Sequence, residues 1–323
     1  MNLRNPQTGP EKAEERKMDR KQIKWRPIIL CVSVLLILYG AVNLFIYIND
    51  LVSSRRTAQE LKNSVPTPDI TEALASAVVS ETGTPVPSVS PSPAPSDIPL
   101  ADIPAQSDKL PAVEYPNGHN LVSRIQQLRK KSEYIIGWIT MDDLDEPVAL
   151  KDNDFFLNHD AMGKRNGNGA IFMDESTGLL TRPYTIMLYG HNMKTGAMFG
   201  NLRKYEKYAY CHKHRILRFD TLYEEGQYVI FAVETISLTP GKKGFVNLTA
   251  LQSGERALRR EALEQLTGHS LHTVLLDVNE EDQLLLLITC VGDDDERLIV
   301  AARRIRDGET VENPKLKSPV SLT

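Results

Sequence analysis

The chain has 323 residues, of which 41% are hydrophobic and 25% are charged, and its formal net charge is −4. This balance is typical of a globular protein, and the absence of a basic surplus argues against a nucleic-acid partner. Three cysteines, Cys31, Cys211 and Cys290, are too few and too scattered for a disulfide framework. Cys31 lies in an apolar run, and the simplest interpretation of the other two is free thiols.

Residues 27–48 form an apolar run without a charged side chain. As a helix rising about 1.5 Å per residue, the run would span roughly 33 Å, enough to cross a bilayer core of about 30 Å. More basic residues stand just before the run (Arg16, Lys17, Arg20, Lys21, Lys24 and Arg26) than just after it (Arg55, Arg56 and Lys62). We therefore expect a cytoplasmic tail, 1–26, a retained signal anchor, and an extracellular remainder.

Residues 49–116 are expected to form an extracellular spacer. The stretch TPVPSVSPSPAPSDIPLADIP is rich in Pro and Ser and almost free of aromatic residues. Such a segment cannot bury enough apolar surface to offset the entropy lost on ordering. Only its first part, 51–62, has the composition to continue as a helix from the membrane.

A folded domain is predicted for residues 117–308, followed by a C-terminal tail, 309–323. Helical spacing of apolar residues occurs at 120–131 and 253–266. Between and after these helices come short strand-like runs: IIGWITM, EPVAL, GAIFM, YTIMLYG, RILRF, QYVIFAVETISL, HTVLLDV, QLLLLITC and RLIVAARRI. Short strands at this spacing predict a mainly β domain, a sandwich or a closed barrel, with added helices.

Cys290, Arg297 and His191 are the candidate catalytic residues. Cys290 ends the most apolar run, LLLLITC, so its thiol can be held rigidly and still meet solvent. Arg297 opens the next run and stays charged at any working pH, so its guanidinium can stabilise a developing oxyanion. His191 follows the run YTIMLYG, at a position suited to proton transfer. Each residue alone also fits a structural role, Cys290 as a buried inert thiol and His191 as a hydrogen-bonded histidine.

The amino-acid sequence around these residues resembles that of a known family. The segments TIMLYGHNMKTGAMFGNLRKY and LLLLITCVGDDDERLIVAARRI are similar to the two signature segments of sortases, specifically those of class B. The upstream segment GWITMDDLDEPVALKDNDFFLNHDAMGKRNGNGAIFMDES and the helix expected at 253–266 extend the resemblance. The resemblance implies an eight-stranded sortase-type β-barrel, here preceded by one transmembrane helix.

The resemblance also implies a reaction. The family nucleophile falls on Cys290, the histidine on His191 and the arginine on Arg297, while Thr289 and Asn192 are assigned to substrate binding. The implied enzyme is a cysteine transpeptidase that opens a Thr–Gly-type bond in a C-terminal sorting signal through a thioester. Its partners would be surface proteins or pilins bearing such a signal, with an amine of peptidoglycan or a pilin lysine as acceptor. No cofactor is expected.

This sequence departs from the usual class B pattern in two places. The interval from Cys290 to Arg297 is seven positions, shorter than in most class B members, and Glu146 stands where a Tyr usually precedes Pro. Both departures bear on substrate preference. Two alternatives stay open: a cysteine hydrolase of the same fold, and a catalytically silent membrane-tethered binding module.

Other polar clusters are set aside. Cys211, His212 and His214 could suggest a metal site, but zinc needs three or four convergent ligands and no second cluster is in view. We expect no metal here. Asp142, Asp143 and Asp145 are interpreted as solvated turn residues.

Overall fold

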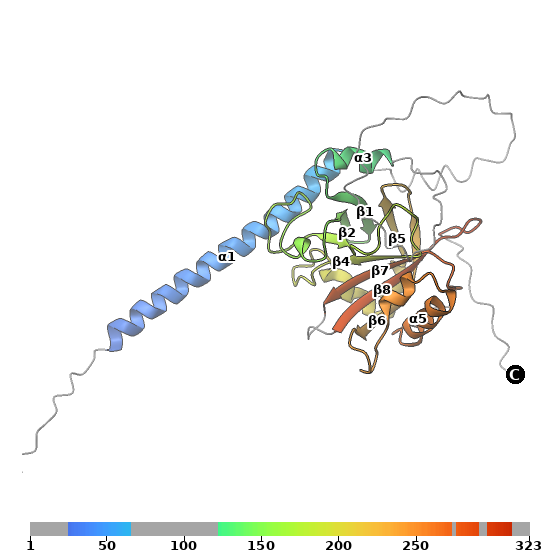
Figure 1. The fold of residues 1–323 in the computed structure, drawn as a ribbon. Helices are drawn as coiled ribbons and strands as arrows, with labels where there is room; N and C mark the ends of the chain where they lie inside the picture. Colours follow the sequence, from blue (N-terminus) through green and yellow to red (C-terminus); the bar gives the residue numbers. More distant parts are fainter. Residues whose placement is uncertain (1–24, 66–121, 273–275, 291–295, 312–323) are drawn as a thin grey trace, which may run out of the picture. The chain divides into compact units, whose positions relative to one another are not determined.

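The computed structural model describes residues 25–65, 122–272, 276–290 and 296–311 (Figure 1). The chain divides into two compact units, Met1–Ile46 and Tyr47–Thr323. Most of the expected spacer and of both expected tails lies outside the described residues.

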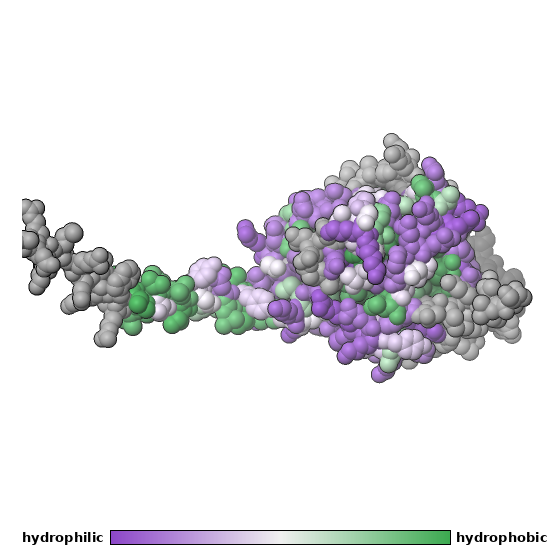
Figure 2. Space-filling view, turned by 90° about the horizontal axis from the view of Figure 1, so that it is seen from below, coloured by the Kyte–Doolittle hydropathy of each residue, from purple (hydrophilic) through white to green (hydrophobic). Residues whose placement is uncertain are grey.

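Helix α1, Trp25–Asn63, supplies the described part of the first unit. Its apolar side chains between Ile28 and Ile46 are exposed, and they form the hydrophobic surface seen along the helix in Figure 2. Among the described helices, α1 is the one whose length and composition would let it cross a membrane. It is therefore a candidate membrane span.

The C-terminal part of α1 belongs to the second unit and packs on its barrel. Leu61, in the last turn of the helix, and Val65, just beyond the helix end, are buried in the barrel's hydrophobic core. Ser54 donates a hydrogen bond to Asn166 Oδ1 (3.2 Å), and its hydroxyl oxygen accepts one from Asn168 Nδ2 (3.2 Å). The first part of the expected spacer, 51–62, lies within α1, and Ser54, Leu61 and Val65 find polar and apolar partners on the barrel.

Eight strands close into a barrel in the order β1-β2-β3-β4-β7-β8-β6-β5, which confirms the expected fold. Their bounds are β1 Ile135–Met141, β2 Leu144–Ala149, β3 Ile171–Met173, β4 Thr185–Tyr189, β5 Ile216–Thr221, β6 Gln227–Ser237, β7 Leu284–Cys290 and β8 Glu296–Arg304. The β2–β3 and β4–β7 pairs are parallel, and the other neighbours are antiparallel. The parallel β4–β7 pair brings the ends of two distant runs together.

Helices and short 3₁₀ turns cover the barrel. They are α3 Ser123–Arg129, η2 Phe155–Leu157, η3 Gly200–Glu206, α4 Tyr208–Lys213, η4 Leu248–Gln252 and α5 Arg256–Gly268. The expected run 272–278 is not a barrel strand: of its described residues only Leu276 makes a bridge, and 273–275 lie outside the described residues.

Strand β7 is apolar on both faces because both are covered. Leu285 and Leu287 belong to the core inside the barrel, whereas Leu286 and Ile288 pack in a second cluster that includes residues of α5. A strand that is buried on both faces has a continuous apolar sequence instead of an alternation of apolar and polar residues. The run that drew attention to Cys290 is therefore a strand packed on both of its faces.

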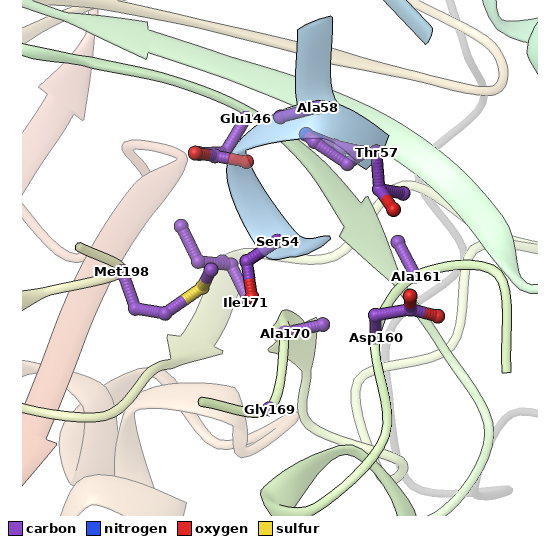
Figure 3. Close-up of a pocket in the computed structure, with 11 residues that line it drawn as sticks. Ser54, Thr57, Ala58, Glu146, Asp160, Ala161, Gly169, Ala170, Ile171 and Met198 are labelled. Carbon is purple, nitrogen blue, oxygen red and sulfur yellow. The ribbon is translucent and has the colours of Figure 1, made fainter. Parts of the chain in front are cut away.

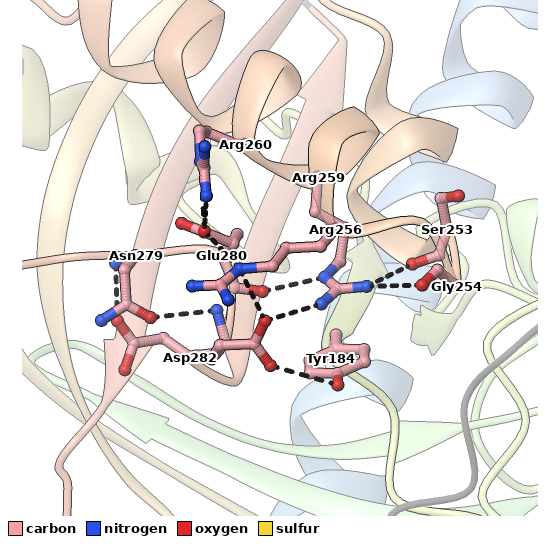
Figure 4. Close-up of polar contacts among 10 residues, drawn as sticks. Tyr184, Ser253, Gly254, Arg256, Arg259, Arg260, Asn279, Glu280 and Asp282 are labelled. Carbon is pink, nitrogen blue, oxygen red and sulfur yellow. Dashed lines mark hydrogen bonds and ion pairs between the residues drawn. The ribbon is translucent and has the colours of Figure 1, made fainter.

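Arginines fasten α5 to the segment before β7 (Figure 4). Arg259 is only 4% exposed and donates hydrogen bonds to the carbonyl oxygens of Glu280 (2.8 Å), Ser253 (2.9 Å) and Gly254 (3.1 Å). Its guanidinium also lies 3.8 Å from the ring centroid of Tyr184. This anchoring keeps α5 over the outer face of β7.

Candidate active site

Three predicted catalytic residues come from the same end of three adjacent strands. Cys290 is the last residue of β7 and pairs with Arg297 of β8 in the antiparallel register. Strand β4 runs parallel to β7, and the N–H of Gly190 donates to the carbonyl of Ile288 (3.3 Å). His191 follows directly, so the register sets it beside the end of β7.

A groove of about 240 Å³ opens at this end of the barrel. His191, Thr289 and Arg297 all line it. The remaining lining residues are Asn153, Leu157, Phe172, Tyr189, Gly190, Leu238 and Ile288. Asn192, predicted to bind substrate, is not among the lining residues and instead makes an isolated antiparallel bridge with Met198.

His191 is held through its backbone and its ring. Its carbonyl oxygen accepts hydrogen bonds from the N–H groups of Met193 (3.1 Å) and Phe199 (3.0 Å). Gly190 before it has no room for a side chain, because a Cβ there would lie 2.9 Å from the ring of Phe199. The ring atom Nε2 lies 2.7 Å from the carbonyl oxygen of Leu157.

Charge in the groove comes from Arg297, which is half-buried and donates from Nη1 to the carbonyl of Glu296 (2.9 Å). Burial raises the pKa of the neighbouring Tyr189, and so does Asp174, while the positive charge of Arg297 opposes the rise. The Tyr189 hydroxyl therefore keeps its proton at neutral pH, with its hydrogen bond directed to Asp174.

Thr289 brings a hydroxyl to the groove wall. The residue is 2% exposed, and its Oγ1 has no hydrogen-bond partner among the residues that the structure describes. A buried hydroxyl without a partner costs free energy that a ligand's polar group can recover. Sequence reasoning selected Thr289 but missed the groove's apolar walls, Leu157 and Leu238. No local pattern marks these two, because they are brought together from separate loops.

The set-aside cluster around Cys211 has structural roles. Cys211 is buried, and burial raises the pKa of its thiol to about 11, so it is protonated and unreactive at neutral pH. His214 Nδ1 lies 2.8 Å from Asp142 Oδ1, and the ring of His212 rests against Tyr208. Within the described ranges there is no group of three or more His, Cys, Asp or Glu residues that could hold a metal ion.

Fold and site together define a closed-barrel protein with a candidate cysteine–histidine–arginine centre. The family model for the Sortase domain matches residues 142–305, about half of the chain. The chain therefore belongs to the sortase family.

Similar proteins are class B sortases. Sortase B of Listeria monocytogenes is 28% identical over 172 residues, which cover 51% of this chain and 66% of the relative, just under two thirds of its length. A solved Bacillus anthracis protein, described as similar to sortase B, is 31% identical with a TM-score of 0.51, covering 60% of this chain and 88% of that chain. The Staphylococcus aureus sortase B–substrate complex is 25% identical with a TM-score of 0.51, covering 58% and 87%.

Proposed function

We propose that this chain is a membrane-anchored cysteine transpeptidase that opens a Thr–Gly-type bond in a C-terminal sorting signal and joins the acyl group to an amine. The observation that carries the proposal is the strand register, which sets Cys290 opposite Arg297 and His191 at the end of the neighbouring strand. Membership of the sortase family supports the same chemistry.

In the first half-reaction, the thiolate of Cys290 attacks the carbonyl carbon of the scissile bond and a C–S bond forms. The resulting oxyanion is stabilised by Arg297, whose planar guanidinium offers two parallel donors. When the C–N bond breaks, His191 gives its proton to the leaving amine. The acyl group then remains on Cys290 as a thioester.

In the second half-reaction, an acceptor amine attacks the thioester. His191 takes the proton that the amine loses, the new amide bond forms, and the C–S bond breaks to return Cys290 as a thiolate. The acceptor proposed is an amine of peptidoglycan or a pilin lysine. A solved sortase B complexed with triglycine, 26% identical to this chain, supports a glycine amine as the first probe.

The groove residues give this substrate class a place to bind. Leu157 and Leu238 offer apolar walls, while Thr289 offers a hydroxyl group. An extended peptide needs both kinds of contact, apolar pockets for side chains and polar partners for its backbone. Asn192 remains a predicted substrate contact that would act from beside the groove.

The anchor and its orientation are part of the proposal. The apolar part of α1 would hold the chain in the cell membrane, with the N-terminus in the cytoplasm and the catalytic domain, residues 117–308, outside. The excess of basic residues before the apolar run supports this orientation.

The test uses the full chain in detergent micelles with two kinds of sorting-signal peptide. In one kind Gly follows the Thr, and in the other kind a different residue follows it. Triglycine serves as acceptor, and products are identified by mass spectrometry. We expect an amide-joined product from the native chain and none from Cys290→Ala. Cleaved peptide without the joined product, at saturating triglycine, would favour the hydrolase alternative. A chain that neither cleaves nor joins any peptide would favour the binding module.

A further inference from the structure

We propose that the carbonyl oxygen of Leu157 is the orienting group of His191, so that the backbone does here what a carboxylate or amide side chain does in other nucleophile–base pairs. The inference rests on the proposed function and names a further positioning element within it. It starts from the 2.7 Å distance between Nε2 of His191 and the carbonyl oxygen of Leu157.

A carbonyl oxygen can only accept a hydrogen bond, so Nε2 must carry a proton whether the ring is neutral or charged. The other nitrogen, Nδ1, is then the one that gives and takes the catalytic proton. A base that acts on a nucleophile is normally held in one tautomer by a third group. In the part of the chain that the structure describes, no side chain is hydrogen-bonded to the ring of His191.

The η2 turn is built to present this carbonyl. Asp152 Oδ1 accepts hydrogen bonds from the N–H groups of Asp154 (3.1 Å) and Phe155 (2.7 Å), which shapes the start of the turn. Phe156 is fully buried, with ring centroids 5.0 Å from Phe155 and 6.2 Å from Phe172. The aromatic packing fixes the middle of the turn, so the carbonyl of the next residue, Leu157, is fixed as well.

Gly169 leaves the space that the contact needs. Its φ is +63°, and a Cβ there would lie 2.3 Å from the carbonyl oxygen of Phe156, 3.1 Å from that of Leu157 and 3.2 Å from Cδ2 of His191. Any side chain at this position would have to move the turn, the imidazole or both. Gly169 therefore permits close approach between the carbonyl and the ring.

Leu157 joins substrate binding to this geometry. Its side chain is 42% exposed and lines the groove, while its carbonyl contacts the base. One residue thus helps to form the apolar wall and to hold the ring that transfers the proton.

The experiment compares Gly169→Ala with Gly163→Ala in the full chain in micelles. Gly163 lies in the same loop with φ +75°, and its added Cβ would meet the ring of Tyr134 at 2.7 Å, so it imposes similar strain away from His191. Histidine-selective ¹⁵N labelling detects the Nε2–H proton of His191, assigned by its loss in His191→Gln. Steady-state assays with a sorting-signal peptide and triglycine give kcat and KM.

We expect a resolved Nε2–H signal in the native chain and in Gly163→Ala, and its loss by exchange with water in Gly169→Ala. Misplacing the base should lower kcat of Gly169→Ala on the order of tenfold to a hundredfold, with KM changed much less. Asp152→Ala should lose the signal and lower kcat as Gly169→Ala does. Asp152→Asn keeps the acceptor oxygen and should show the native signal and kcat.

The inference is overturned if native His191 carries no proton on Nε2, if Gly169→Ala keeps both the Nε2–H signal and kcat, or if Gly163→Ala loses as much of both as Gly169→Ala does. The spectra need no substrate, so they test the inference even if no peptide is turned over. Conversely, the native chain could join peptides while its His191 shows no Nε2–H signal. That result would contradict the inference and leave the proposed function intact.

Discussion

At the groove, Arg297 lies half-buried on β8, paired in register with Cys290. Its proposed role depends on the shape of the guanidinium as well as on its charge, because two parallel N–H groups match an oxyanion better than a single ammonium does. The type of residue at this position should therefore matter in the transition state more than in substrate binding.

We expect Arg297→Ala to lower kcat on the order of a hundredfold to a thousandfold, as for the loss of an oxyanion donor, with a smaller change in KM. Arg297→Lys keeps the charge and should recover only part of that loss. The measurement is kcat and KM for one sorting-signal peptide with triglycine, after thermal unfolding has shown that both variants fold. Full activity in Arg297→Ala would contradict the assigned role.

Among the elements, α5 carries a buried arginine, Arg259, that ties the helix to its neighbouring segments. Arg259→Ala would leave the carbonyls of Ser253, Gly254 and Glu280 without their donor and would remove the group stacked on Tyr184. We expect the free energy of unfolding to fall by about 3 kcal/mol, because a buried hydrogen-bonded charge cannot be removed without stranding its partners. Denaturant unfolding of the full chain in micelles measures it.

Arg260→Ala is the matched control on the same helix. Its side chain is 54% exposed and contacts Glu280, so its removal should cost much less than that of Arg259. Equal losses in the two variants would show that the buried contacts of Arg259 do not anchor α5.

The C-terminal part of α1 packs against the barrel next to the carboxyl group of Glu146. Glu146 on β2 lines a small pocket with Ser54, Thr57 and Ala58 of the helix (Figure 3). Burial, with a smaller contribution from Asp145, raises the pKa of Glu146 from 4.5 to about 8. The charged groups nearby are Asp145, which pairs with Lys62 of the helix, and Asp160 in the pocket wall.

The sign of the resulting pH dependence follows from linkage. The pKa of Glu146 is higher in the packed state. Its contribution to the stability of helix packing is therefore fully present below pH 4.5 and is lost as the pH rises through about 8. We expect hydrogen–deuterium exchange in residues 47–63, corrected for intrinsic rates, to show less protection at pH 9 than at pH 6.

Glu146→Gln cannot ionise and should make that protection independent of pH over the same range. Helix α5 serves as the internal reference in each sample. Protection of 47–63 that falls equally in the native chain and in Glu146→Gln would assign the pH dependence to another group.

Across the whole molecule, local patterns predicted the strands better than the contacts between them. The barrel class followed from short apolar runs, and the two signature segments selected His191, Cys290 and Arg297 before any geometry was known. The run 272–278 was expected as a strand but is not among the eight barrel strands, because apolar composition alone does not tell whether a run joins the sheet; its residues 273–275 lie outside the described residues.

The parts that sequence could not predict depend on distant segments meeting. The bond from His191 to Leu157 joins residues that lie 34 positions apart, and the contact of Ser54 with Asn166 joins residues 112 apart. Composition suggested a spacer from residue 49 with a helical first part at 51–62, but it could not show that Ser54, Leu61 and Val65 have their polar and apolar partners on the barrel. Such partners become visible only when the chain is folded.

The central claim is that Cys290 carries the acyl group. The most direct measurement is the intact mass of the full chain after mixing with a sorting-signal peptide without an acceptor amine, followed by acid quenching. We expect an added mass equal to the N-terminal acyl part of the peptide in the native chain and in Cys211→Ala, and none in Cys290→Ala. An adduct that persists in Cys290→Ala, or one that disappears in Cys211→Ala, would contradict it.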